Sequence, residues 1–559
     1  MKLNTKPVMK PILVALLIAS PATAQAASPM IPDAGNILQQ IQPVTPPTTP
    51  STGTGLTIER TGGAELPSSA PFLVQTLQIA GNTMFATPTL HSLVADAEGK
   101  SLSLSQLGEL AARITNYYQS HGYPLARAII PTQTITAGVV RIEIIEARYG
   151  QVSLDNRSRV SDSLLQSTLS PLQSGQVIGQ AGLDRTLLLL SDIPGVLVGA
   201  TLKPGEAVGT SDLQVNSTPS PAVTGNLALD NYGNRYTGRA RIGGTLNLSN
   251  PLQHGDVLSM TGLSSGSGLS YGRITYESLL NGQGTRIGGS YAALRYGLGE
   301  PLAALKAHGS AQVASLWAKQ PLVRSRDANL YGQIQYDSKQ LKDRIDASDI
   351  RTDRHLDNLT FNLAGDALLL DGINSLNLGW TSGRVGYDDS AAQLADAVTA
   401  RTQGGFSKWN ASLARMQSLS SKNALYFALS GQWANTNMDS AEKMIVGGPS
   451  TVRSYDVGAL SGDTGYLATA EFRHDLDMAW NGRWQAVAFV DTAHVTFNKN
   501  VWVAGTNSAS LTGAGIGLNW SGPNQWRGKA MVATRIGSTP TLVETSASTR
   551  AWVEISKGF

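Results

Sequence analysis

Residues 222–559 alternate apolar and polar side chains through one short segment after another. Within residues 239–249, for example, Ile242 and Leu246 fall on one face and Arg241 on the other. Side chains of a β-strand point alternately to two faces, so this pattern predicts a series of amphipathic strands.

Two kinds of β protein give this alternation. A soluble β-sandwich would turn the apolar face inward, whereas a membrane barrel would turn it outward. The pattern runs from residue 222 to the aromatic Phe559, and charges such as Arg273 and Glu277 lie on the polar face. Membrane-crossing strands need about 9–11 residues and must close, because an open edge in lipid leaves backbone groups unpaired. These features favour a transmembrane antiparallel β-barrel over residues 222–559.

Residues 72–149 and 150–221 combine helical and strand periodicities. The first stretch predicts the order strand, helix, helix, strand, strand, with a strand at 73–79, a helix at 104–121 and strands at 126–133 and 139–147. The second stretch repeats this order at 151–155, 162–169, 182–192, 196–203 and 211–217. Two small α+β domains are therefore expected before the barrel.

Residues 1–26 have the pattern of a secretory signal peptide. Lys2, Lys6 and Lys10 precede an apolar run at 12–19, and small residues suited to cleavage follow at 22–26. The run is too short to span a membrane as a helix. Export combined with a barrel pattern predicts the bacterial outer membrane as the destination.

Residues 27–71 predict a short helix and a linker. The helix is expected at 33–42, with Ile37, Leu38 and Ile41 on one side. Residues 43–71 are rich in Pro, Thr, Ser and Gly, a composition that predicts an extended tether. At about 3.1 Å per residue this tether could span up to ~90 Å. A disordered tail is the alternative.

Composition excludes several classes of chemistry. The 559-residue chain has no cysteine, so disulfides and thiol catalysis are excluded, and a net charge of +3 is too small to favour nucleic acid. Mean hydropathy is −0.09, which also suits a barrel, because only every second strand residue faces lipid.

Enzyme motifs are weak. Residues 262–266 match G-x-S-x-G, but in a Gly/Ser-rich stretch and not in a strand-to-helix turn. The histidines lack H-E-x-x-H spacing, and there is no phosphate-binding G-x-x-x-x-G-K sequence. We expect no catalytic, cofactor or metal site.

Several motifs together resemble a known family. They lie at 79–83, at 192–196, at 209–213 and in the stretch 229–238 that opens the barrel. The residues that carry the last of these are Asp230, Asn231, Gly233, Thr237 and Gly238. Nearly the whole mature chain is similar to the TpsB transporters of two-partner secretion, the ShlB/FhaC/HecB family. The resemblance implies two periplasmic POTRA domains and a sixteen-stranded barrel. We expect the helix at 33–42, held by the long tether, to plug this barrel.

The same resemblance covers a loop motif. Val452-Arg453-Ser454-Tyr455 is similar to the family's Val-Arg-Gly-Tyr, and Phe489-Val490-Asp491-Thr492-Ala493 to its Phe-x-Asp-x-Gly. The family pattern implies that the loop folds into the barrel and that Arg453 pairs with Asp491. Spacing alone would favour a surface arginine unrelated to Asp491. Ser454 and Ala493 replace glycines, which would cost roughly 1–2 kcal/mol at any position that requires positive φ.

The family resemblance implies the export of an unfolded TpsA-type exoprotein, such as a haemolysin, adhesin or haemagglutinin, by a monomer in outer-membrane lipid. Its POTRA domains would recognise the exoprotein, and a free strand edge could do so by β-augmentation. A barrel-assembly or insertion factor is the alternative, and a passive porin a third. Two modules, a proline-rich linker and an N-terminal helix favour the transporter.

Overall fold

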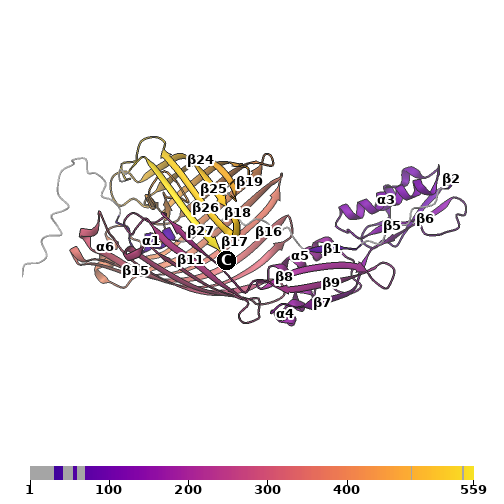
Figure 1. Cartoon of the computed structure of the whole chain (residues 1–559), viewed down its shortest axis with the longest axis horizontal. Helices are drawn as coiled ribbons and strands as arrows, with labels where there is room; N and C mark the ends of the chain where they lie inside the picture. Colours follow the sequence, from indigo (N-terminus) through magenta and orange to yellow (C-terminus); the bar gives the residue numbers. More distant parts are fainter. Residues whose placement is uncertain (1–30, 42–54, 60–68, 480, 544–546) are drawn as a thin grey trace, which may run out of the picture.

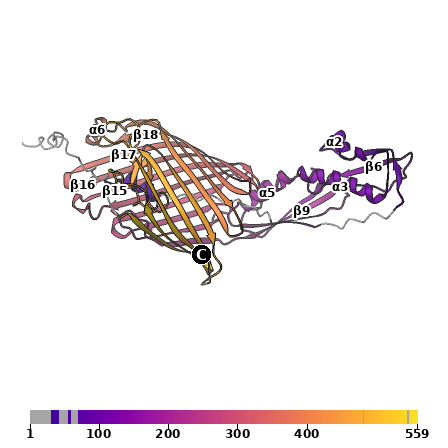
Figure 2. The ribbon, with the colours of Figure 1, turned by 90° about the horizontal axis from the view of Figure 1, so that it is seen from above.

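The computed structural model describes residues 31–41, 55–59, 69–479, 481–543 and 547–559. A closed β-barrel forms one end of the molecule, and two small α/β modules extend from it in a row (Figure 1). The view from above shows both modules projecting from the same end of the barrel (Figure 2). We call this the module end and the opposite end the far end. The predicted signal peptide, 1–26, lies outside the described residues.

Sixteen antiparallel strands form the barrel, as predicted. Each strand pairs with the next along the chain, and the last pairs with the first. The strands are β10 (Val223–Asp230), β11 (Arg241–Ser249), β12 (Val257–Ser264), β13 (Leu269–Leu279), β14 (Arg286–Gly297), β15 (Ala307–Arg324), β16 (Ala328–Ile345), β17 (Ile350–Leu369), β18 (Gly372–Tyr387), β19 (Gly404–Ser418), β20 (Asn423–Ala434), β23 (Thr464–Asp475), β24 (Arg483–Thr496), β25 (Ser508–Ser521), β26 (Trp526–Arg535) and β27 (Thr549–Gly558).

The outer face of the barrel is apolar. Leu316, Ile334 and Phe361 are exposed there, whereas Ser315 and Asn358 on the inner face are buried. Phe361, Trp380, Trp409 and Trp433 lie directly opposite one another on four successive strands, as in an interfacial aromatic girdle. This orientation is that of a membrane barrel and not of a sandwich.

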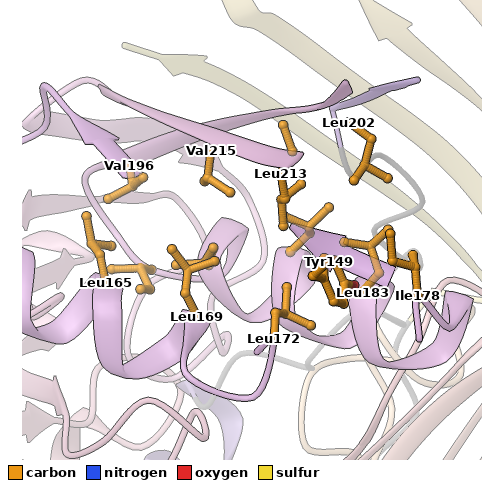
Figure 3. Packing of buried hydrophobic residues seen from close by; sticks show 14 of the residues in the cluster. Tyr149, Leu165, Leu169, Leu172, Ile178, Leu183, Val196, Leu202, Leu213 and Val215 are labelled. Carbon is orange, nitrogen blue, oxygen red and sulfur yellow. The ribbon is translucent and has the colours of Figure 1, made fainter. Parts of the chain in front are cut away.

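The module next to the barrel has a sheet covered on one face by two helices. Its elements are β7 (Arg148–Asn156), α4 (Asp162–Leu169), α5 (Gln180–Ser191), β8 (Val196–Pro204) and β9 (Thr210–Pro219). Leu165, Leu169 and Leu183 of the helices point toward Leu213 and Val215 of the sheet (Figure 3). These side chains recur at helical and strand spacings, which is why the sequence pattern located the elements.

The outer module differs from the predicted order strand, helix, helix, strand, strand in two places, one of which is the short strand β4 between its two helices. The predicted strand at 73–79 is two strands, because the backbone N–H groups of Gln75 and Thr76 both donate to the carbonyl of Gly138 and the chain changes sheets there. The elements are β2 (Phe72–Val74), β3 (Thr76–Ala80), α2 (Thr87–Ser92), β4 (Lys100–Leu102), α3 (Leu104–Ser120), β5 (Arg127–Ile129) and β6 (Val139–Ile145).

The linker is not a free tether along its whole length, which corrects the sequence prediction. Residues Leu56–Ile58 form β1, which pairs in parallel with β8 at the edge of the inner module's sheet. Leu56 and Ile58 also pack against that module's core. Composition did not reveal this strand because the partner that stabilises it lies far along the chain.

The N-terminal helix α1 (Ala34–Ile41) lies inside the barrel, toward the far end (Figure 1). Its Ile37 and Leu38 are buried among residues of the barrel wall. Asp33 precedes the helix, and its Oδ1 accepts the backbone N–H of Asn36 at 2.9 Å, the geometry of a helix N-cap. Among the described helices, none is long and apolar enough to cross a membrane.

Candidate functional site

The lumen contains a second segment, the loop of residues 435–463 between β20 and β23. The loop folds inward and forms a hairpin of β21 (Met444–Val446) and β22 (Leu460–Gly462). Gly447 and Gly448 begin its tip with φ of 103° and 115°, a conformation that favours glycine. Beyond them, Val452 and Tyr455 are buried against wall residues of β24 and β25. We call residues 447–459 the loop tip.

Arg453 of the loop tip forms a forked ion pair with Asp491 of β24. The guanidinium Nε and Nη2 lie 2.8 and 2.7 Å from the two carboxylate oxygens, and the backbone N–H of Arg453 donates to Oδ2 at 3.1 Å. The two residues are only 5% and 1% exposed. Bidentate geometry with little water around it makes this a strong contact.

Neighbouring wall residues complete the Arg453 site. The third guanidinium nitrogen donates to Glu471 Oε1 at 2.7 Å, and the guanidinium carbon lies 3.4 Å from the centre of the Phe489 ring. The indole of Trp552 donates to the Arg453 carbonyl at 2.7 Å. Sequence reasoning placed Phe489 here but missed Glu471 and Trp552, which lie on β23 and β27.

The two departures from the family's glycines fit without backbone strain. Neither Ser454 nor Ala493 has a positive φ. Ser454 is 1% exposed and lies against Gly513 of β25, where an added Cβ would come within 1.9 Å of the serine hydroxyl. The room for the serine side chain therefore comes from a glycine on the facing wall.

The α1 helix is fastened by an ionic cluster. Asp33 Oδ2 accepts from Arg354 Nη2 at 2.9 Å and from the Ser440 hydroxyl at 2.7 Å. The same guanidinium contacts Asp343 and Asp439, each at 2.7 Å. The backbone N–H of Ala34 donates to Asp343 Oδ1 at 2.8 Å. One arginine of β17 thus pairs with three carboxylates, one of which is the N-cap residue of the helix.

A segment of the loop, residues 437–443, supports α1 and is itself anchored to the wall. Glu442, 2% exposed, lies 2.6 Å from Lys339 Nζ and 2.8 Å from Lys408 Nζ. Asn437, 4% exposed, donates to the carbonyls of Ala400 and Asn500 in two other far-end loops. We call this segment the shelf. Its contacts join residues far apart along the chain, and no local pattern signalled them.

Residues 229–238, the motif at the start of the barrel, join its first strand to its last strand and fix the shape of the loop after β10. The guanidinium of Arg241 donates two hydrogen bonds to the carboxylate of Asp230. The side chain of Asn231 hydrogen-bonds to the backbone of β27 at Ala551 and Val553 and so extends the pairing of β10 with β27. At Gly233, a Cβ would come within 1.9 Å of the Gly238 carbonyl.

Gly238 has a φ of 104°, and Thr237, 2% exposed, accepts from the hydroxyl of Ser265. Within the same loop Asn234 donates both to Gln40 of α1, at 2.9 Å, and to Val457 of the loop tip, at 3.2 Å. The opening motif therefore also contacts the two segments inside the lumen.

Ionic contacts also fix the modules. Arg324 of β15, 4% exposed, forks onto Asp192 of the inner module at 2.7 and 2.8 Å. At the junction of the modules, burial opposes ionisation of Glu146. Hydrogen bonds from Thr83 and Met84 outweigh that effect and hold the pKa of this carboxyl below its usual value.

No group of three or more His, Cys, Asp or Glu among the described residues is arranged to hold a metal ion. The cavities in and around the lumen are lined by wall strands, loop residues and α1. The arrangement suits gating of a passage: a closed barrel contains two segments, each held by ion pairs. These features define a transmembrane β-barrel transporter with two α/β modules at one end.

Comparison with known proteins identifies the family. The model of the haemolysin secretion/activation protein family ShlB/FhaC/HecB matches residues 209–520, more than half of the chain, and the ShlB-type POTRA domain matches residues 72–147. The chain belongs to this family. It is a protein-secretion transporter of the bacterial outer membrane, with POTRA domains in the periplasm and a sixteen-stranded barrel. The module end is therefore periplasmic and the far end extracellular.

The chain is also similar to named relatives and to solved structures. The heme/hemopexin transporter protein HuxB of Haemophilus influenzae is 28% identical over 485 residues, covering 86% of this chain and 85% of that protein. The structure of CdiB from Escherichia coli is similar with a TM-score of 0.70 at 21% identity, over 90% of this chain and 93% of that one. BamA from Haemophilus ducreyi, lacking POTRA domains 1–3, has a TM-score of 0.53 at 14% identity, over 87% of this chain and 100% of that one. These two structures share the fold.

Proposed function

We propose that the chain takes an unfolded TpsA-type exoprotein from the periplasm and passes it through the barrel after α1 has left the lumen. The observation that carries this proposal is α1, a helix packed inside a closed barrel and fastened through Asp33. The helix is covalently joined to the modules that would meet the exoprotein first, so cargo binding and plug release can be coupled. A passive porin needs no such connection.

Capture would take place at the modules by strand addition. In the inner module β1 occupies the β8 edge, so a cargo strand must displace β1 to bind there. The outer module's β3-β6-β5 sheet has two edges without a described neighbour. Full-length protein in detergent should bind the exoprotein's N-terminal domain, and a variant lacking residues 72–217 should not. Normal secretion by that variant would contradict capture at the modules.

Residues 1–26 would be the export signal, and the mature chain would act as a monomer whose apolar outer face contacts outer-membrane lipid. HuxB is named a heme/hemopexin transporter, so an exoprotein of a haem-acquisition system is the first cargo to test. A barrel-assembly role is supported only by the fold shared with BamA.

The deciding experiment measures single-channel conductance in planar bilayers. Deleting residues 27–42 should raise the conductance, because it removes α1 and Asp33 from the lumen. Deleting only residues 27–31, which leaves Asp33 and the helix intact, is the matched control and should leave the conductance unchanged. Equal conductance in both variants and in the wild type would show that α1 does not gate the passage.

A further inference from the structure

The inner wall of the barrel has two halves of different chemistry. Strands β23–β27 with β10 and β11 carry inward charges, including Asp230, Arg241, Glu471 and Asp491, and the loop tip lies over this half. On the other side, β14, β15 and β17–β19 carry uncharged hydrogen-bonding side chains along one cavity: Ser290, Ser315, Thr360, Asn377, Asn410 and Ser412. The same strands and β16 also carry inward charges, among them Asp337, Lys339, Arg354 and Lys408. We call the uncharged stretch the neutral wall.

One open space of the lumen follows the neutral wall, and another lies along β10–β13 beside the loop tip. The first, a cavity of about 750 Å³, lies between the strands of the neutral wall and the segments in the lumen, including Leu38 and Gln39 of α1. The apolar side of α1 packs on the extracellular half of the same strands, against Leu341, Leu356 and Phe406. Release of α1 would therefore lengthen this cavity toward the extracellular end along the wall that already lines it.

Side chains of the neutral wall are available to a passing chain. Asn377, Ser412 and Ser430 lie directly opposite one another on β18, β19 and β20, a row with steps of about 4.8 Å. None of these three side chains makes a hydrogen bond with another residue of the described chain. Amide and hydroxyl groups both donate and accept, so they can satisfy the backbone of an extended polypeptide whatever its sequence.

Charges on this side are largely compensated. Lys339 and Lys408, the lysines of β14–β20 that line this cavity, are both paired with Glu442 of the shelf, and Asp337 of β16 accepts hydrogen bonds from Gln335. A wall without a strong field neither traps residues of opposite charge nor repels residues of like charge, so a chain can slide.

We propose that the cargo crosses the barrel in extended form along the neutral wall, and that this path suits segments with few charged residues. This inference rests on the proposed secretion function and adds to it a path and a class of substrate.

The test uses the variant lacking residues 27–42 in planar bilayers, with a synthetic peptide of Asn, Ser, Thr and Gly as the probe. A length of about 30 residues exceeds the membrane thickness when extended. The double variant Asn377→Arg with Ser412→Arg should shorten the duration of each current block about tenfold. A change of this size corresponds to the loss of one or two hydrogen bonds between the wall and the peptide. Asn519→Arg, which replaces an inward asparagine of the charged half bonded to Gln485, is the matched control and should leave the block unchanged.

A second measurement does not depend on the arginine variants. The chain has no cysteine, so Asn377→Cys, Ser412→Cys and Asn519→Cys each introduce a single thiol. The peptide should protect the first two from a charged thiol reagent and leave the third reactive. The same assay can be run on the intact protein from the periplasmic side, because the cavity lies between α1 and the module end.

The two proposals fail separately. Unchanged conductance on deletion of residues 27–42 contradicts the plug. Protection of residue 519 equal to or greater than that of 377 and 412, in either protein, overturns the neutral-wall path. A block shortened equally by Asn519→Arg and by the neutral-wall pair overturns it as well.

Discussion

The loop tip and the N-terminal helix are held to the same barrel by the same kind of contact, arranged in opposite ways. At the loop tip the segment carries the arginine, Arg453, and the wall carries Asp491. At the helix the segment carries the carboxylate, Asp33, and the wall carries Arg354. Among the described residues Asp491 has Arg453 as its cation partner, while Glu471 also pairs with Arg473. Arg354 at the second site already has two other carboxylate partners.

This difference suggests which segment moves. Removal of the loop tip would leave Asp491 buried without its cation, a cost of several kcal/mol. Departure of Asp33 leaves Arg354 still paired with Asp343 and Asp439, so the cost is smaller. The loop is also tied to strands at both ends, whereas the helix is tied at one. We infer that the helix leaves first and that the loop tip stays in place.

The largest effect is expected from Arg453→Ala or Asp491→Ala. Either change leaves a buried charge unpaired, at a cost of about 3–5 kcal/mol, so secretion of the exoprotein should be abolished or sharply reduced. The backbone ladder of the barrel is untouched, so heat-modifiable mobility in gels should persist. The double variant should lose little more than either single one, because both changes remove the same contact. Additive losses, or full secretion by either single variant, would show that the residues do not act as a pair.

Arg354→Ala should rank next, because it releases α1 and also leaves two buried carboxylates of the wall and shelf without their cation. Single-channel conductance should rise, and Arg354→Lys should restore closure only in part, since lysine cannot fork. Arg384→Ala removes an exposed arginine from the neighbouring strand and is the control. If Arg354→Ala has the same resting conductance as the wild type, the ionic cluster at Arg354 does not hold the helix in the lumen.

Asp33 offers a finer test, because one carboxylate both caps the helix and contacts Arg354. Asp33→Ala loses both contacts, and loss of the cap alone costs about 1 kcal/mol, so open events should become about fivefold more frequent. Asp33→Asn keeps a good cap but removes the charge that faces Arg354, so it should open more often than the wild type and less often than Asp33→Ala. If both variants open equally often, the contact with Arg354 matters more than the cap.

The smallest effect is expected from the linker strand. Thr57→Pro removes a backbone donor from the middle of β1 and should free it from β8, while Thr57→Val preserves the strand and is the control. Hydrogen exchange at residues 56–58 should become faster, and plug opening should increase less than twofold, because the change lengthens the tether without touching either ion pair. A larger opening than in Asp33→Ala would mean that β1 and not the ion pair holds the plug.

Local patterns in the sequence were sufficient to predict the barrel and the N-terminal helix. The period-2 alternation after residue 222 predicted the barrel because every strand must turn an apolar face to lipid, and it located β11, expected within 239–249 and observed at Arg241–Ser249. The helix around Ile37 and Leu38 was predicted at 33–42 and observed at Ala34–Ile41. The loop motif at Arg453 was recognised by resemblance, and its spacing alone pointed to a surface residue.

By itself, the sequence determined the alternation of faces, the order of the elements and the residues able to form ion pairs, because these depend on side chains a few positions apart. Only the tertiary structure decided which charges meet. Asp33 and Arg354 are 321 positions apart, and Glu442 pairs with lysines of β16 and β19. It also decided that β1 joins the inner module and that Ser454 is accommodated by Gly513. Closure of the barrel sets these contacts, because it brings distant strands around one lumen, and no local periodicity records that geometry.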